Sequence, residues 1–269
     1  MPASRPSAGT AVINNSDTLA SKINGLWLAD ASGSIPDLHG AQSSLALTGS
    51  GVPSYSSGSP MGGQLTGNGT DMAYAAISPT INSWGWAIGC VGLYTNTPGT
   101  TLDTWFAFGD ATHDSGGVVG GIFVDNGTFG ASGKIVGLFR VINGGTVGQI
   151  NGPSFSSNTQ YACGLQVDGP DGNVGRLLVN GTAYTTFTNV PENSFGSDAF
   201  SNIAMCGSKR QTTSLFPASS NSKVAMGWYA APGSGINSTV LTDWTNDPWN
   251  SLQSPGGGSI RRMMTLGVG

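Results

Sequence analysis

Short apolar segments separated by turn residues recur along almost the whole sequence, and this pattern restricts the possible folds more than any other feature. Clear examples are GLWLA at 25–29, GWAIGCVGLY at 85–94 and KIVGLFRV at 134–141. Apolar runs of roughly four to eight residues bounded by Gly, Pro, Asn or Asp are typical of β-strands, and no long helical patterns alternate with them. We therefore predict an all-β chain whose strands pack as two antiparallel sheets.

About a dozen strands are predicted, and a chain of 269 residues suits one large β-sandwich or two small domains. Strands that form a sandwich are expected at short, regular spacing along the sequence. The predicted strands are residues 25–29, 44–48, 64–67, 72–77, 85–94, 104–108, 118–124, 134–141, 160–167, 175–179, 183–187, 203–206 and 223–229.

The composition excludes several other classes of protein. Glu192 is the only glutamate among 14 acidic residues, so long solvated helices are not expected. Seven Trp and ten Phe supply the apolar area that disordered chains lack. A net charge of −4 with scattered Lys and Arg disfavours a nucleic-acid partner. No apolar stretch suits membrane insertion, and residues 1–13 lack the apolar centre of a signal peptide.

The most legible hairpins lie in the segment 160–187. Tyr161–Val167 and Val174–Val179 flank the turn sequence DGPDGN at 168–173, and Asn180-Gly181 then reverses the chain into Thr182–Phe187. Asn-Gly is the sequence that two-residue hairpin turns favour most strongly. We predict three consecutive antiparallel strands here.

One short helix is predicted near the C-terminus. Ser238 is a suitable N-cap, and Val240, Leu241 and Trp244 are spaced to form one apolar face before Asp247-Pro248 ends the segment. We expect this helix to cover an edge or end of a sheet.

Residues 1–12 and 253–259 are poor in bulky apolar side chains, unlike the body of the chain. We assign residues 1–22 to an N-terminal arm, 23–250 to the sandwich domain and 251–269 to a C-terminal linker and tail. The tail combines a basic pair with an apolar run, a combination that suits packing either on its own domain or on a neighbouring subunit, and we predict attachment to a neighbouring subunit. The residues predicted for this contact are Arg261, Arg262, Met263, Met264 and Leu266.

The three cysteines are predicted to be buried thiols. Cys90, Cys163 and Cys206 are widely spaced, and each lies in an apolar, strand-like run. A disulfide between two of them stays open as an alternative. A zinc site is disfavoured because the sequence has no closely spaced CxxC pair, and no metal site is expected.

Taken in order, the segments resemble the concanavalin A-like jelly roll, in its laminin-G-like branch. The resemblance covers residues 23–250 and departs from the pattern in the Gly-rich stretch 111–159. It implies a jelly-roll β-sandwich with one short C-terminal helix. The sequences that carry it are GLWLA at 25–29, DLHG at 37–40, GGQLTGNGTDMAY at 62–74, TWFAFGD at 104–110, LLVNG at 177–181, and the strands 203–207 and 224–229.

A second likeness concerns the end of this domain. The sequence NDPW at 246–249, followed by a linker and Arg261-Arg262, is similar to the ending of laminin-G-like domains in tailed-phage virion proteins. The resemblance implies a virion component, made in the host cytoplasm, whose partners are other virion proteins in an oligomeric assembly. Free thiols fit such an origin.

Residues for known hydrolytic chemistry are sparse. Glycosidases typically use a pair of carboxylates, and the chain has one Glu and no acidic cluster of that kind. His39 and His113 lie in polar loops, where we favour solvated side chains over a general base or a metal ligand. No GxSxG motif is present. We therefore predict no catalytic residues and a protein that is not an enzyme.

Two loop regions are candidate ligand sites. Asp110 and Asp114 in one loop, and Asp168, Asp171 and Asn173 in the other, carry the oxygens that calcium prefers, although the same residues are common in turns. We expect no cofactor, with calcium as the possible exception.

Aromatic side chains offer a second kind of ligand site. Trp105 beside Asp103 is a candidate platform for a sugar ring. Trp84 and Trp86 share one strand face and are expected to pack in the core, while Trp249 is expected to anchor the C-terminal segment.

These observations support three functional hypotheses. The first is a non-enzymatic virion structural protein, as a capsid decoration or tail-associated component, that attaches through its terminal arms and also adheres to surface glycans. The second is a carbohydrate-binding lectin or adhesin. The third, which rests on fold analogy, is a polysaccharide-active enzyme on the same fold.

Overall fold

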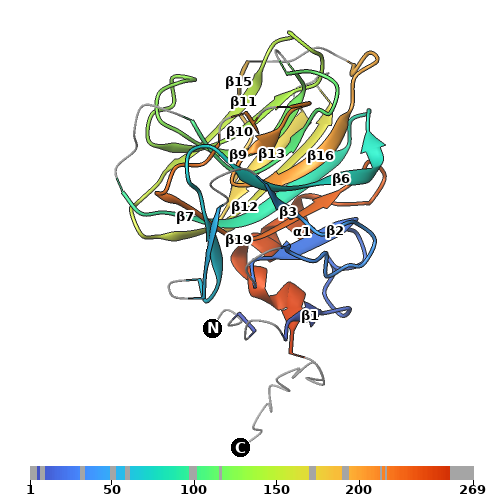
Figure 1. Ribbon diagram of the computed structural model, residues 1–269. Coiled ribbons are helices and arrows are strands. Elements are labelled where there is room, and N and C mark those ends of the chain that lie inside the picture. Colours follow the sequence, from blue (N-terminus) through green and yellow to red (C-terminus); the bar gives the residue numbers. More distant parts are fainter. Residues whose placement is uncertain are drawn as a thin grey trace, which may run out of the picture.

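Two antiparallel β-sheets stacked face to face form the body of the protein in the computed structural model (Figure 1). One nine-residue α-helix near the C-terminus completes the fold. The predicted all-β sandwich with a short C-terminal helix is therefore confirmed. The structure describes residues 5–6, 10–30, 34–48, 53–57, 61–96, 102–114, 117–169, 174–189, 194–212, 214–215 and 217–254.

We call the first sheet sheet 1; its strand order is β15-β11-β10-β9-β8-β16-β6-β3, with antiparallel pairing throughout. Its middle strands β8 to β10 follow one another in sequence, as expected of a meander. In chain order its strands are β3 (Ala46–Thr48), β6 (Met72–Ile81), β8 (Asp103–Gly109), β9 (Val119–Asp125), β10 (Lys134–Arg140), β11 (Gly148–Ser154), β15 (Phe187–Asn189) and β16 (Phe200–Met205).

Sheet 2 has the order β14-β13-β12-β7-β19-β5-β4, and β2 also pairs with β19 beside β5. Its strands are β2 (Gly25–Leu28), β4 (Ser54–Ser56), β5 (Gln64–Thr66), β7 (Trp86–Tyr94), β12 (Gln160–Gly169), β13 (Val174–Val179), β14 (Thr182–Tyr184) and β19 (Ser222–Ala230). Two small pairings, β1 (Val12–Ile13) with β20 (Leu252–Gln253) and β17 (Ser208–Lys209) with β18 (Ser214–Leu215), lie outside the two sheets.

Aromatic rings fill the space between the sheets. Trp86 packs edge-on against Phe108 and Phe200, with ring centroids 5.6 and 5.4 Å apart. Glycines inside the strands leave room for these rings. A Cβ at position 92 would lie 2.5 Å from the Trp105 ring, and one at position 227 would lie 2.6 Å from the Phe106 ring. The abundance of glycine therefore reflects core packing as well as turns.

A third layer covers the outer face of sheet 2. Helix α1 (Ser238–Asn246) buries Val240, Leu241 and Trp244, and the Trp244 ring meets Trp228 of β19 edge-on at 5.2 Å. The predicted apolar face is confirmed, but the helix lies over the sheet face, against β12 and β13, and not at an edge. The apolar face of an amphipathic helix is wide, and a sheet face buries more of it than a sheet edge does.

The cap of this helix also differs from the prediction. The N-cap is Asn237, and its side chain accepts a hydrogen bond from the Val240 N–H at 3.0 Å. Ser238, the predicted N-cap, is the first residue of the helix. Both residue types suit this position, so the sequence alone did not separate them.

Residues 10–22, which we assigned to an arm, lie against the sandwich. Leu19 is fully buried in the same apolar layer as α1, and β1 pairs with β20, so the first and last strands are neighbours (Figure 1). The domain boundaries at 22/23 and 250/251 stay predictions. Among the described residues, the one α-helix is too short to cross a membrane.

The hairpins of segment 160–187 are confirmed as far as β14. Strand β12 pairs with β13 and β13 with β14, and Asn180-Gly181 forms the second turn. Thr182–Phe187 is not one strand, however. The chain leaves sheet 2 after Tyr184, and β15 begins at Phe187 in sheet 1, where it pairs with β11. Strand β11 was not predicted, because its sequence GQINGPS lacks an apolar run.

All three cysteines are buried free thiols, as predicted. Cys90 of β7 lies directly opposite Cys163 of β12. Burial raises the pKa of each thiol, which holds all three in the protonated and unreactive form.

Candidate functional site

Trp105 is not available to a ligand. Its side chain is fully buried between the sheets, where the ring stacks on Tyr161 with centroids 6.4 Å apart. The register of β8 against β9 shifts between Thr104 and Phe106, so Trp105 and Phe106 both enter the core. The predicted sugar platform at Trp105 is therefore wrong, because the irregular register of β8 brings this ring into the core together with Phe106.

Asp103 is also buried, and its carboxylate holds a loop of its own chain. It accepts hydrogen bonds from the Ser219 N–H at 3.0 Å, the Ser219 hydroxyl at 2.6 Å and the Ser222 hydroxyl at 3.2 Å. Both carboxylate oxygens are thus occupied by protein donors, which makes Asp103 a structural residue and not a ligand-binding one.

Asp110 and Asp114 do lie in one loop, together with His113. Asp110 accepts hydrogen bonds from the Thr112 N–H and hydroxyl, at 2.7 and 2.5 Å, and from His113 Nδ1 at 2.7 Å. Burial alone would raise the pKa of Asp110, but these hydrogen bonds outweigh it and lower the pKa overall. Asp114 accepts from the Thr212 N–H at 2.7 Å, which ties this loop to segment 208–212.

The second predicted loop is described only in part. Asp168 accepts two hydrogen bonds from Gln166 Nε2, at 2.7 and 2.9 Å, and Asp171 and Asn173 lie outside the described residues. Within the described part of the chain, no group of three or more metal-binding side chains is assembled. The calcium hypothesis stays a prediction. The predicted attachment residues 261–264 and 266 also lie outside the described residues.

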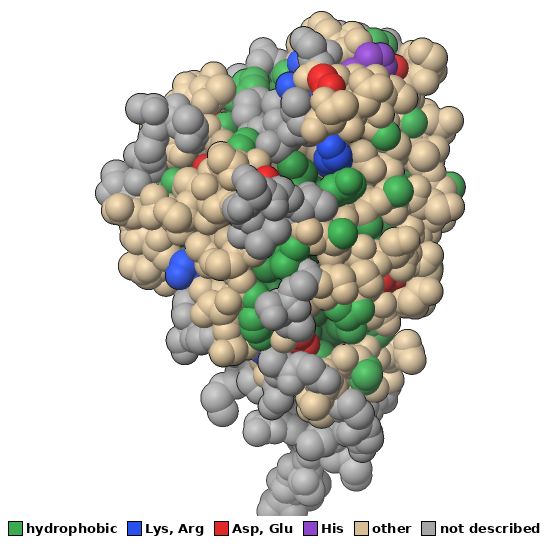
Figure 2. Space-filling model, in the orientation of Figure 1, with side chains coloured by type: hydrophobic (Ala, Val, Ile, Leu, Met, Phe, Trp, Pro, Cys, Tyr) green, Lys and Arg blue, Asp and Glu red, His purple; other side chains and the backbone are tan. Residues whose placement is uncertain are grey.

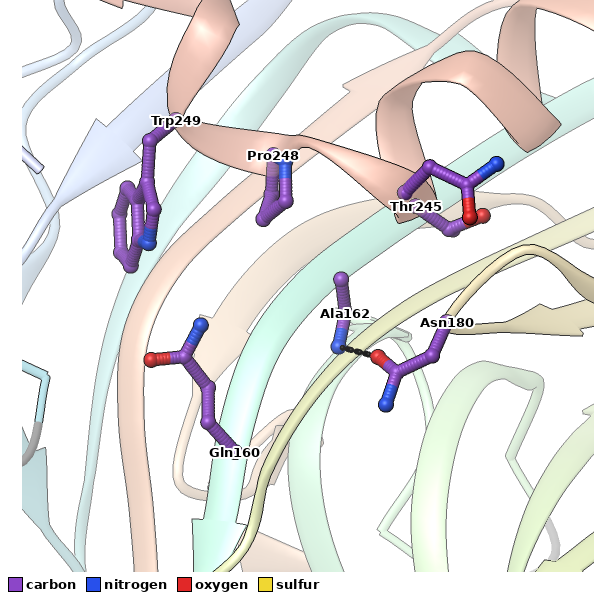
Figure 3. A pocket seen from close by; sticks show the side chains of 7 residues that line it. Gln160, Ala162, Asn180, Thr245, Pro248 and Trp249 are labelled. Carbon is purple, nitrogen blue, oxygen red and sulfur yellow. Dashed lines mark hydrogen bonds between the residues drawn. The ribbon is translucent and has the colours of Figure 1, made fainter. Parts of the chain in front are cut away.

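A surface hollow that the sequence did not indicate opens where α1 ends above sheet 2. We call it the amide pocket. Figure 3 shows it from close by, and its volume is 280 Å³. The helix side contributes Pro248 and Trp249, and the strand side contributes Gln160 and Asn180. The remaining lining residues are Ala162, Thr245 and Asn246.

The Asn180-Gly181 turn and the end of α1 are joined to each other. The two turn residues have φ values of 47° and 80°, the left-handed conformation that Asn and Gly adopt in hairpin turns. The Gly181 N–H donates to the Thr245 hydroxyl at 3.1 Å, and this hydroxyl donates to the Leu241 carbonyl at 2.8 Å. These bonds fix the position of Asn180 relative to the helix.

Trp249 is held by a short 3-10 helix, Pro248–Ser251, that follows α1. The Arg5 guanidinium lies 5.6 Å from the centroid of its ring. Arg5 itself donates to the carbonyls of Met61 and Ala29, at 3.0 and 2.9 Å, and forms an ion pair with Asp30. The indole is 6% exposed and anchors the C-terminal segment, as predicted.

The amides of this pocket keep much of their hydrogen-bonding capacity. Asn180 Oδ1 accepts from the Ala162 N–H at 2.8 Å, which directs its NH₂ group away from that bond (Figure 3). Within the described part of the chain, the side-chain amides of Gln160 and Asn246 make no hydrogen bond. None of the described residues that line the pocket is charged. Its chemistry therefore suits an uncharged ligand rich in hydroxyl or amide groups.

Comparisons with known proteins show the fold and little more. No protein-family model matches the sequence, and no curated protein matches it. The structure is similar to the sialidase of Trypanosoma rangeli in complex with sialic acid, at 12% identity and a TM-score of 0.58, covering 84% of this chain and 33% of that one. The same sialidase with 2,3-difluorosialic acid, a covalent intermediate, gives 11% identity, a TM-score of 0.57 and the same coverages. This chain thus spans about a third of the sialidase chains.

These neighbours correct the prediction that the protein is not an enzyme. The prediction relied on the missing pair of carboxylates, but sialidases use a tyrosine nucleophile and are an exception to that rule. The shared fold occurs within enzymes, so the absence of a carboxylate pair does not exclude catalysis. The resemblance to phage virion proteins gains no support from these structures, and the virion role and location stay predictions.

Proposed function

We propose that the chain is a glycan-binding β-sandwich that holds one uncharged sugar residue in the amide pocket. The observation that carries the proposal is the pair of unbonded amides, Gln160 and Asn246, beside the indole of Trp249. An amide offers a donor and an acceptor side by side, which suits the neighbouring hydroxyls of a sugar.

The size of the pocket supports a single sugar residue. Its 280 Å³ lie near the lower limit of the range of about 300–1,000 Å³ for small-molecule sites. The neighbours give separate support, since one of them was solved with sialic acid and therefore binds a sugar. A neutral pocket, however, favours a sugar without a carboxylate, because an anion would find no cationic partner there.

The test is a glycan array probed with the folded protein, followed by titration calorimetry with the glycans that bind. Both are done with calcium and with chelator, and the glycans are examined afterwards for cleavage. We expect Gln160→Ala combined with Asn246→Ala to weaken binding about tenfold or more, because each hydrogen bond contributes about 0.5–1.5 kcal/mol.

The matched control is Asn82→Ala, which removes an exposed asparagine far from the pocket in the loop between β6 and β7. It should bind like the wild type. An array without binding, or a double variant that binds as tightly as the control, would overturn the proposal.

A further inference from the structure

A second hollow lies on the outer face of sheet 1, on the opposite side of the sandwich from α1. Its volume is 120 Å³. Two arginines, Arg140 at the end of β10 and Arg210 after β17, contribute to its wall. The rest of its lining is apolar and consists of Val119, Phe123, Phe129, Leu138 and Val147. We call it the arginine pocket.

The chain builds this pocket by folding loops over the sheet face. The carboxylate of Asp125 accepts hydrogen bonds from the N–H groups of Gly127 and Ala131, at 3.0 and 2.7 Å, and so curls the loop after β9. Phe129 in this loop then packs on the apolar cluster of Phe123 and Leu138. The floor is therefore part of a small buried core and not a chance surface depression.

Arg140 is held by the backbone at the rim. Its Nε and Nη2 both donate to the Gly117 carbonyl, at 3.1 and 2.7 Å. The guanidinium is thereby fixed at the end of β10, where it contributes to the pocket wall. A fixed guanidinium loses little conformational freedom when a ligand binds.

Arg210 brings a second positive charge, and no carboxylate of the described residues forms an ion pair with it. Its Nη1 donates to the Asp114 carbonyl at 2.7 Å, and its buried Nε has no hydrogen-bond partner among the described residues. None of the ion pairs among those residues includes Arg210. Partial burial lowers the pKa of Arg210, and the charge of Asp114 opposes this shift. A partly desolvated cation of this kind is stabilised by an anion placed beside it.

Two positive charges in one wall are unusual for this molecule. The chain has 10 basic residues and a net charge of −4, and charged side chains are sparse on the face shown in Figure 2. The volume sets the size of the ligand, since a cavity of about 150 Å³ lined by apolar side chains holds one benzene molecule. A pocket of 120 Å³ thus accepts the greater part of one ring.

We propose that the arginine pocket binds a carboxylate carried on a ring-sized apolar group, with the ring against Phe123, Phe129 and Leu138 and the carboxylate toward Arg210. The proposal does not rest on the glycan site, which lies on the other sheet and is uncharged. The carboxylate belongs either to a free aromatic acid or to an acidic sugar, and the five apolar lining residues favour the aromatic acid.

The test uses calorimetric titration and ligand-observed NMR on the full chain with three probes. Benzoate carries the proposed ring and charge, benzyl alcohol keeps the ring without the charge, and glucuronate keeps the charge on a polar ring. We expect saturable binding of benzoate, and at least about tenfold weaker binding of the other two.

Two variants locate the site. Arg210→Gln should weaken benzoate binding about tenfold or more, and Val147→Trp should abolish it by filling the pocket. Arg176→Gln, a matched arginine change in β13 of sheet 2, should leave it unchanged. Thermal unfolding checks that each variant is folded. If benzoate does not bind, if benzyl alcohol or glucuronate binds as well, or if folded Arg210→Gln and Val147→Trp both bind normally, the proposal is wrong.

Discussion

The buried aspartates Asp103 and Asp110, at the two ends of β8, and the amides of the amide pocket are all polar side chains, but they do different work. Asp103 and Asp110 are buried, and their oxygens accept hydrogen bonds from the protein itself. Gln160 and Asn246 are at the surface, and their amides have no hydrogen-bond partner among the described residues. The difference teaches that a polar side chain is available to a ligand only if its own chain does not use it, and spacing in the sequence does not reveal this.

The largest expected effect concerns Trp105, the residue that sequence reasoning placed at the ligand site. Trp105→Ala should lower the free energy of unfolding by about 3–5 kcal/mol, because it removes a fully buried ring and leaves a cavity above Gly92. Chemical denaturation followed by far-ultraviolet circular dichroism measures this loss. A Trp105→Ala variant as stable as the wild type would show that this side chain does not support the core. The contrast between side chains that the fold uses and those available to a ligand would then fail for Trp105.

A smaller loss is expected for Asp103→Ala. It leaves the Ser219 N–H and the hydroxyls of Ser219 and Ser222 without their acceptor, at a cost of about 2–4 kcal/mol. Asp168→Ala, the change of an exposed aspartate near the end of β12, serves as the control and should cost less than about 1 kcal/mol. Equal losses of stability in the two variants would show that the buried carboxylate of Asp103 stabilises the fold no more than the exposed carboxylate of Asp168.

The next effect depends on pH and concerns Asp110. Its folded-state pKa lies below its unfolded value of about 3.9, so its ionised form stabilises the fold. This contribution is fully present above the unfolded pKa and is lost as the pH falls through the folded pKa. Asp110→Asn should therefore be less stable than the wild type by about 1 kcal/mol at neutral pH, and the difference should shrink in acid below about pH 4.

Denaturation of both proteins at a series of pH values provides the measurement. A difference that grows in acid would mean that the pKa of Asp110 is raised in the folded protein, as burial alone would make it. The hydrogen bonds from Thr112 and His113 would then be too weak to hold the loop.

Most of the fold was predictable because its signals are local. Apolar runs between turn residues located most strands of both sheets, and Asn180-Gly181 located a hairpin turn. Strand β11 was not predicted, because its residues are small and polar. They form a strand by pairing with β10, and no local sequence pattern indicates this contact. The crossing of the chain from β14 in sheet 2 to β15 in sheet 1 was not predicted either, because it depends on the pairing of β15 with β11.

The candidate sites were less predictable because they combine residues from distant parts of the chain. Gln160 begins a strand, Asn180 lies in a turn and Asn246 ends a helix, and nothing in their spacing indicates that they meet. The aromatic residue that lines the pocket, Trp249, was correctly expected to anchor the C-terminal segment, but not to border a hollow. The bulge in β8 reversed the expected role of Trp105, and a bulge of this kind has no reliable sequence signature.

The smallest expected effect on stability is that of Asn246→Ala. The side chain is exposed and makes no hydrogen bond among the described residues, so its removal should change the free energy of unfolding by less than about 0.5 kcal/mol. Denaturation alongside Asn180→Ala provides the contrast, because Asn180 bonds the Ala162 N–H and occupies a left-handed turn position, where alanine is strained. A clear loss in Asn246→Ala would show that this amide supports the fold, as the buried carboxylates do, and would remove the distinction between the two regions.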